Sequence, residues 1–518
     1  MNSKSLSTIL FVVMALLLGI WSGVSILVNP TGGIAGLSKL TTLICIAAAL
    51  INPRIGLYVL AFQAMYIDEM KRLGVYYGAE SLQTVQEILV GPILTLCALN
   101  LGLLVHVMLG RAKMSFLGWS LYGIGVALGL YYLTGGAIGG GDSFAKRLYN
   151  AAAASSYTTV IPLAYAFFKE IKDWVKFLSF QTLLTIPSAA WAIWQYFNGF
   201  NNLEWTYALS GLSPVHSGQM LAFEHPRVFG FFGSASAMGC LCIYVTFCVW
   251  RAISIRDWRW VFVLTSLLLF AALICSTQRS ALLSPFIFGI VIFCYRSRFK
   301  TIALYGTLAA MFVIGVLNST WLLNEGLDKI NTAISSDGKW GSEVLKVSTF
   351  SDRLYGWERL KRPESWSLFG TGETTSSFQG NEKYGVNYSH DMINRSLMKV
   401  GAVGLAAILA IAGTIAWSLH RLVWRLPDKS QRILGALSLG TSVPICLMSA
   451  AGGDNFTATP YNLAIWSALA GVFVLKRSVD SGQFSETPEI GEVSDPQAEI
   501  KTAGRFPAPR PLALNSKR

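Results

Sequence analysis

Two arginines and a histidine beside apolar runs have the chemistry to bind phosphate and to move a proton. Arg227 stands in the stretch Glu-His-Pro-Arg-Val-Phe-Gly, and Arg279 stands in Ser-Thr-Gln-Arg-Ser between two apolar runs. A guanidinium presents planar donors that match phosphate oxygens. His390 precedes another apolar run, and an imidazole titrates near neutral pH. These residues predict a phosphate-binding site with an acid–base group.

Each of these residues also has a simpler interpretation, which the sequence leaves open. A histidine at a membrane edge can be a solvated loop residue, and an interfacial arginine commonly reaches lipid headgroups as an anchor. Arg279 departs from that interpretation because its hairpin has almost no loop in which the side chain could stray. The outer loops contain no acidic pair with metal-ligand spacing, so we expect no metal ion and no cofactor.

A further candidate lies on a predicted loop helix. The helix is expected to begin at Ser351, whose hydroxyl can cap free amides, and to end before Pro363. Arg353 and Trp357 share one of its faces. Arg353 is therefore a second-rank site residue, with a solvated helix face as the alternative.

The elements that position these residues are predicted to be membrane helices. The chain of 518 residues is 53% hydrophobic and only 13% charged, against about 25% charged residues in soluble domains. Its mean hydropathy is +0.49. Apolar windows of about 20 residues predict an all-α polytopic protein with about 14 transmembrane helices. They fall near 8–28, 36–52, 55–67, 84–109, 115–134, 148–168, 177–197, 229–250, 260–276, 280–295, 301–319, 397–419, 433–450 and 459–475.

Charged residues in the connections predict the orientation. With the N-terminus inside, every second connection is basic, as expected for cytoplasmic loops. The basic residues there include Arg54, Arg111, Lys169, Lys172, Arg251, Arg298, Arg421 and Lys476. The opposite face has most of the loop carboxylates, among them Asp68, Glu69, Glu204 and ten between residues 320 and 391. A net charge of +13 follows from this orientation, so nucleic-acid binding is not expected.

The predicted organisation is one membrane domain and a tail. Residues 1–475 form the integral domain, with a long extracytoplasmic loop at 320–396 that has short helices. The first apolar run is too long for a cleaved signal peptide, so it is expected to remain as a span. Residues 476–518 are poor in aromatic residues and are predicted to be a disordered cytoplasmic tail.

Three separated stretches resemble the O-antigen ligase and O-antigen polymerase superfamily of bacterial envelope glycosyltransferases. They are Arg227-Val-Phe-Gly-Phe-Phe-Gly, then Ser276-Thr-Gln-Arg279-Ser-Ala, and a third part spread over the long loop. The third part comprises Arg353-Leu-Tyr-Gly-Trp357, Leu368-Phe-Gly-Thr-Gly372, His390-Asp-Met-Ile-Asn394 and Gly401-Ala-Val-Gly404. Members commonly have asparagine after the loop histidine and an acidic residue before the glycine, where this chain has Asp391 and Lys399.

The resemblance implies a GT-C-like fold and a metal-independent transfer of saccharide from undecaprenyl pyrophosphate to an acceptor hydroxyl. Arg227 and Arg279 would compensate the pyrophosphate charge, and His390 would accept the proton of the attacking hydroxyl. Asp391 and Asn394 are additional site candidates. The implied location is the outer face of a bacterial cytoplasmic membrane, with both termini cytoplasmic. The implied partners are the lipid-linked oligosaccharide, an acceptor glycan or lipid, membrane lipid and other polysaccharide-assembly proteins.

Several functions remain open at this point. A polymerase of exopolysaccharide or O-antigen is favoured because the chain and its loop are long. A ligase that transfers to lipid A core and a protein O-oligosaccharyltransferase are the alternatives within the enzyme class. A secondary transporter is the alternative outside it, but ion-coupled carriers usually keep ionisable groups near the membrane midplane. The ionisable residues in the predicted spans are Lys39, Glu87, His106 and Lys399, each near a span end.

Overall fold

The computed structural model describes most of the chain between residues 28 and 321 and a C-terminal helix. The described ranges are 28–78, 82–139, 155–210, 228–234, 237–276, 279–295, 297–321 and 459–480, with shorter pieces at 401–407, 420–424 and 432–438 and some single residues. In these ranges the regular structure is helical and no strand is present. The prediction of an all-α protein is confirmed for this part of the chain.

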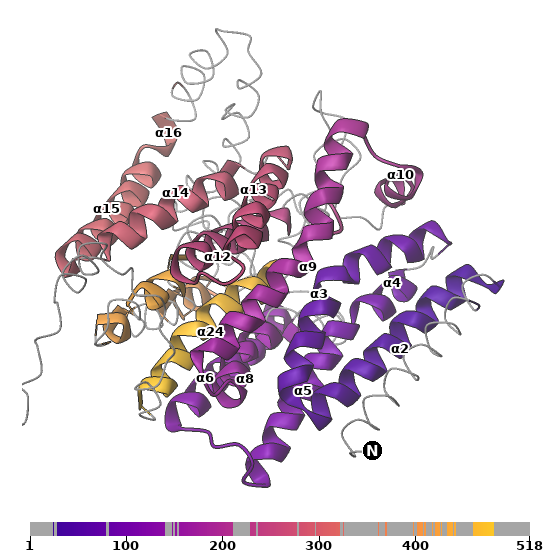
Figure 1. Cartoon of the computed structure of the whole chain (residues 1–518), viewed down its shortest axis with the longest axis horizontal. Coiled ribbons are helices and arrows are strands. Elements are labelled where there is room, and N and C mark those ends of the chain that lie inside the picture. Colours follow the sequence, from indigo (N-terminus) through magenta and orange to yellow (C-terminus); the bar gives the residue numbers. More distant parts are fainter. Residues whose placement is uncertain are drawn as a thin grey trace, which may run out of the picture.

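The helices follow the predicted apolar runs closely. Their bounds are α2 (Pro30–Ile51), α3 (Pro53–Tyr76), α4 (Leu82–Leu89), α5 (Gly91–Met108), α6 (Phe116–Gly139), η1 (Ser156–Thr159), α8 (Val160–Phe167), α9 (Ile171–Asn198), α10 (Asn202–Leu209), η2 (Ala237–Cys240), α12 (Leu241–Ser254), α13 (Arg259–Cys275), α14 (Arg279–Cys294), α15 (Arg298–Leu317), α16 (Ser319–Trp321) and α24 (Tyr461–Asp480). Figure 1 shows them as a bundle of crossing helices.

Four helical stretches in the described part are long and apolar enough to cross a membrane. They are Gly33–Ile51, Glu87–Met108, Ala237–Ser254 and Tyr461–Asp480. A membrane protein is therefore the class that the structure supports. The number of fourteen spans stays a prediction, and the first predicted span lies almost wholly outside the described residues.

Helix α3 is longer than the predicted span at 55–67. Asn52 caps its first turn by accepting from the amides of Arg54 and Ile55, and the helix continues to Tyr76. The prediction that Asp68 and Glu69 lie in a loop after the span at 55–67 is wrong. Each has a basic partner three residues later on the same helix face, so the helix continues through them.

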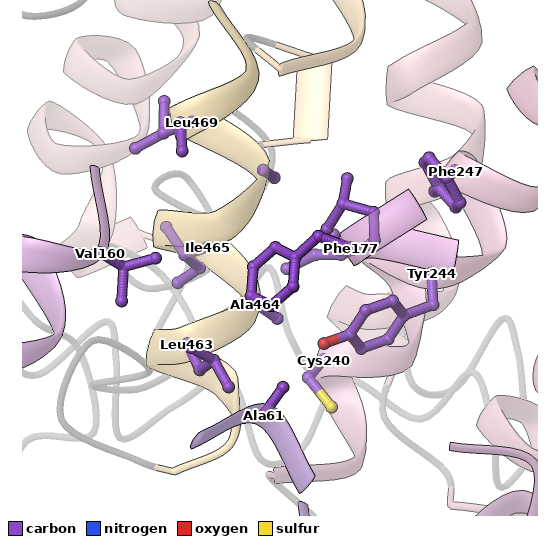
Figure 2. Packing of buried hydrophobic residues seen from close by; sticks show 14 of the residues in the cluster. Ala61, Val160, Phe177, Cys240, Tyr244, Phe247, Leu463, Ala464, Ile465 and Leu469 are labelled. Carbon is purple, nitrogen blue, oxygen red and sulfur yellow. The ribbon is translucent and has the colours of Figure 1, made fainter. Parts of the chain in front are cut away.

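The core lies where α9 and α24 meet their neighbours. Figure 2 shows Ala464 and Ile465 of α24 among Val160 of α8, Phe177 of α9 and Tyr244 of α12. Figure 1 shows α9 between the α2–α3–α5 group and the α12–α13 pair. The side chains of this core are almost fully excluded from the surface. Such packing fixes how the helix ends are arranged.

Trp174 of α9 shows how closely α9 and α24 approach each other. Its indole N–H donates to the carbonyl of Ser467 at 2.8 Å. A Cβ added at Gly471 would come within 2.4 Å of the indole ring. Glycine at this position therefore lets the backbone of α24 pass directly over Trp174.

Three of the connections predicted to be cytoplasmic meet at one end of the bundle. Arg54, in the first turn of α3, forms an ion pair with Asp173 at the start of α9. Arg477 of α24 donates to the carbonyls of Tyr165 and Ala166 at the end of α8. The alternation of basic connections along the chain therefore predicted that these connections lie together, and the side of the membrane that they face stays a prediction. α24 also continues through Lys476, where the tail was predicted to begin, to Asp480.

Candidate functional site

An irregular segment, residues 228–234, lies at the other end of the bundle and directly follows Arg227. Its amides are bound by side chains of α9. The Oε1 atom of Gln195 accepts from Phe229 N at 3.2 Å and from Gly230 N at 2.9 Å. The hydroxyl of Ser188 accepts from Phe231 N at 3.0 Å. Side chains of a helix thus replace the partners that a helix or strand would give these amides.

Arg72 of α3 binds the carbonyl groups of the same segment. Its Nη1 donates to Gly230 O at 2.7 Å, and its Nη2 donates to Phe232 O at 3.3 Å. The guanidinium is fully buried and lies 4.9 Å from the centroid of the Phe229 ring. Glu69, one turn earlier on α3, places a carboxylate oxygen 2.9 Å from Nη2. A buried charge needs such pairing, and here the carboxylate, two carbonyls and a ring face provide it.

Glu204 orients the side chain of Gln195. Its carboxylate accepts from Gln195 Nε2 and, at 2.7 Å, from the indole N–H of Trp191. The acid also closes a capping box at the start of α10, where Asn201 and Glu204 each accept from the other's backbone amide. Because the carboxylate requires a donor, the amide nitrogen of Gln195 faces it. The oxygen of the amide therefore faces segment 228–234.

Two glycines permit this close arrangement. Gly230 has a φ of +56°, and a Cβ there would lie 2.5 Å from the carbonyl oxygen of Ser188. A Cβ on Gly233 would lie 2.8 Å from a carboxylate oxygen of Asp68. Both positions require glycine, the first for its conformation and both for space.

Asp68 and Lys71 add a second pair of charges beside the segment, beyond the predicted span at 55–67. Burial raises the pKa of the Asp68 carboxyl above its usual value, and the nearby charges of Lys71 and Arg72 only partly oppose this rise. Burial lowers the pKa of Lys71. The Lys71 ammonium lies 5.1 Å from the centroid of the Tyr207 ring. Asp68 therefore lies beside the backbone of Gly233, and Lys71 lies against α10.

Arg279 begins α14, and the start of α14 lies at this same end of the bundle. α12 and α13 are joined by a short connection and pack along each other, so they run antiparallel. α13 ends at Cys275 and α14 starts at Arg279, so α14 starts at the end where α12 starts. α14 also contacts η2, the 3-10 helix after segment 228–234. The two stretches that were identified by their arginines therefore come from one end of the structure.

The remaining predicted site residues lie outside the described residues. These are Arg227, Arg353, His390, Asp391 and Asn394, and for Arg279 the backbone alone is described. Their side-chain geometry therefore stays a prediction. Within the described ranges, no three His, Cys, Asp or Glu residues are grouped as ligands for a metal ion.

Reasoning from the sequence missed Arg72, Gln195, Ser188 and Glu204. Two signals in the sequence point to the last three of these. Ser188 and Gln195 are seven residues apart in an apolar run, so they share one helix face. Asn201 and Glu204 have the spacing of a capping box.

No family model, curated protein or solved structure matches this chain.

Proposed function

We propose that this protein is a lipid-linked saccharide glycosyltransferase of the bacterial cytoplasmic membrane. It transfers a glycan from undecaprenyl pyrophosphate to an acceptor hydroxyl at the outer face, and its product is an exopolysaccharide or O-antigen polymer. The proposal starts from the stretches of sequence at Arg227, Arg279 and His390 that resemble the O-antigen ligase and polymerase superfamily.

The observation that carries the proposal is the fixed backbone after Arg227. A segment without regular structure is tolerated in a membrane protein where protein side chains satisfy its polar groups. Arg72, Gln195 and Ser188 do so for residues 228–234. A site that stabilises a developing charge needs donors held in place before the reaction. The start of α14, with Arg279, lies at the same end, where free helix amides also favour an anion.

The reaction follows from the chemistry of these groups. The acceptor oxygen attacks the anomeric carbon of the donor saccharide, and the bond from that carbon to the phosphate oxygen breaks. His390 takes the proton of the acceptor hydroxyl. Arg227 and Arg279 bind the pyrophosphate as its negative charge increases, so undecaprenyl pyrophosphate leaves as a stabilised anion.

The distribution of charge supports an outer-face site. The basic connections at Arg54, Lys169 and Arg477 lie together at one end of the bundle, and residues 228–234 lie at the other. Under the positive-inside rule the basic end is cytoplasmic. The segment after Arg227 is then extracytoplasmic, where lipid-linked oligosaccharides are used.

A secondary transporter is the second candidate, and the charged residues of α3 favour it. Asp68, Lys71 and Arg72 are ionisable groups in the last turns of α3, and ionisable groups on a membrane helix often mark a transport path. Arg72 is engaged with two carbonyls and Glu69, however, which suits a structural task better than the release of an ion.

The experiment that separates these functions uses purified protein. In detergent, a glycosyltransferase releases undecaprenyl pyrophosphate from a lipid-linked saccharide in the presence of acceptor. A transporter does not, but it moves solute into sealed proteoliposomes. To separate the enzymes, the gene is expressed in a strain that lacks it and the surface polysaccharide is run on a gel. Loss of long chains without the gene indicates a polymerase, and long chains retained on the carrier indicate a ligase.

A further inference from the structure

We infer that Arg72 and Gln195 are positioning residues: they hold residues 228–234 in one conformation, and pyrophosphate binding at the adjacent Arg227 depends on that conformation. This inference rests on the proposed function for the role of Arg227. The clamp itself, defined as Arg72, Gln195 and Ser188 with residues 228–234, is a feature of the described structure.

Segment 228–234 depends on side chains from outside it. Within residues 228–234, the backbone hydrogen bond described joins Phe232 N to Phe229 O. The amides of Phe229, Gly230 and Phe231 go to α9 instead. A buried backbone group without a partner is unfavourable, so the segment keeps this shape because the clamp supplies the partners.

The side chains of the clamp come from two helices. α3 donates to carbonyl groups through Arg72, and α9 accepts from amides through Gln195. Gly230 is bound on both its N–H and its C=O. A residue held from two packed helices can neither rotate its peptide groups nor shift without breaking a bond. Val228, which is covalently bonded to Arg227, is itself fully buried.

A charged donor stabilises a leaving pyrophosphate only when it is in place before the bond breaks. A displacement of about 1 Å by a distant mutation can reduce a rate by roughly 100-fold. Loss of the clamp should therefore act through Arg227, and it should affect the donor saccharide rather than the acceptor.

Gln181 provides a matched control on the same helix. It is also a fully buried glutamine, and it lies two heptads before Gln195 on the same face of α9. Its amide donates to Ser467 Oγ at 3.0 Å and accepts from Tyr244 OH at 3.0 Å. Gln181→Leu therefore removes two buried hydrogen bonds without touching the clamp.

A distance measurement tests the clamp without requiring activity. Spin labels are placed at positions 227 and 253 of a cysteine-free protein, because Ile253 is exposed at the far end of α12. We expect a narrow distance distribution in the parent and in Gln181→Leu, and a broad one in Gln195→Leu. Ser188→Ala is a milder variant that keeps the test decisive if Gln195→Leu does not fold, and it should broaden the distribution to a smaller extent. A distribution that is broad in the parent, or unchanged by both clamp variants, overturns the inference.

A kinetic cycle then tests the link to Arg227. Gln195→Leu should raise the KM for the lipid-linked donor or lower kcat by roughly 10- to 100-fold, and the KM for the acceptor should stay the same. In the Arg227→Ala background the same change should have little further effect, because both act on one interaction. Equal effects of Gln195→Leu in the two backgrounds would contradict the positioning role. If no variant or parent transfers saccharide, the proposed function fails, while the distance measurement still decides whether the clamp exists.

Discussion

Arg72 and Gln195, on two different helices, bind opposite polar groups of one residue, Gly230. Arg72 donates to its carbonyl oxygen at 2.7 Å, and Gln195 accepts from its amide at 2.9 Å. Gly230 has a positive φ, which glycine adopts readily, and it has no side chain that would collide with Ser188. The relationship connects α3 and α9 through an irregular segment that neither helix contains. Predictions about stability and about activity follow from it.

Removing the Arg72 side chain should destabilise the protein strongly. Arg72→Met leaves two buried carbonyls without their donor and Glu69 without its cationic partner. Breaking a buried ion pair by removing one partner typically costs about 3–5 kcal/mol. Arg72→Lys keeps the charge but loses the planar pair of guanidinium donors, so we expect a smaller loss of stability. Thermal unfolding in detergent measures both. Arg54→Met serves as a control, because it removes an arginine that also pairs with a carboxylate but is partly exposed. Equal melting temperatures for Arg72→Met and wild type would contradict the clamp.

Asp68→Asn should stabilise the protein in a way that depends on pH. Burial raises the pKa of this carboxyl in the folded protein, so ionising it disfavours the folded state. Below the unfolded pKa of about 3.8 both forms are neutral, and wild type and variant should match. As the pH rises from this value to the folded pKa, wild type should lose stability relative to the variant, and above the folded pKa the difference should become constant. Melting temperatures from pH 3 to pH 8 check this. A variant less stable than wild type at pH 8 would show that attraction from Lys71 and Arg72 outweighs burial.

The orientation can be tested with an impermeant maleimide in intact cells or spheroplasts. A cysteine at Ser376 or Gly380 in a cysteine-free background should react, because both lie in the loop predicted to be extracytoplasmic. A cysteine at Ser430 should not, because its connection is basic. Permeabilised cells provide the control, in which all sites should react. Labelling of Ser430 without Ser376 would reverse the orientation and remove the proposed site from the outer face.

Sequence reasoning predicted the helices well, because a membrane helix is set by a long apolar run. It also predicted which connections meet at the basic end, as shown by Arg477 at the end of α8. It failed at Asp68 and Glu69, because the apolar run ends at residue 67 while the helix continues to Tyr76. In the folded protein these charges are matched by Lys71, Arg72 and the backbone of segment 228–234. Such contacts join residues about 160 positions apart in the chain, and no local pattern specifies them.

The two arginines of the proposed site should be separable from simple membrane anchors. Arg279→Lys keeps a positive charge but loses the planar donor pair that fits a pyrophosphate. Transfer should therefore decrease while membrane insertion remains normal. Arg227→Ala should behave in the same way. The measurement is polymer synthesis per unit of inserted protein. Arg298→Lys serves as a control, because Arg298 is the first residue of α15 and lies at the opposite end of α14 from Arg279. Wild-type synthesis by both variants would leave the arginines as anchors.

The most direct test of the proposed function is transfer by His390→Ala. Purified enzyme is given a lipid-pyrophosphate saccharide and acceptor, the released carrier is followed, and abundance and thermal stability are measured on the same preparation. A general base contributes roughly 10² to 10⁴ in rate, whereas losing a solvated loop histidine changes stability by less than about 0.5 kcal/mol. We predict a stable variant whose rate falls by at least about 100-fold and does not recover at saturating acceptor, because a missing base lowers kcat itself. Recovery at high acceptor concentration would instead assign His390 to acceptor binding. A stable variant that transfers at a rate within about threefold of wild type, well below the effect of a lost base, would contradict the catalytic role of His390.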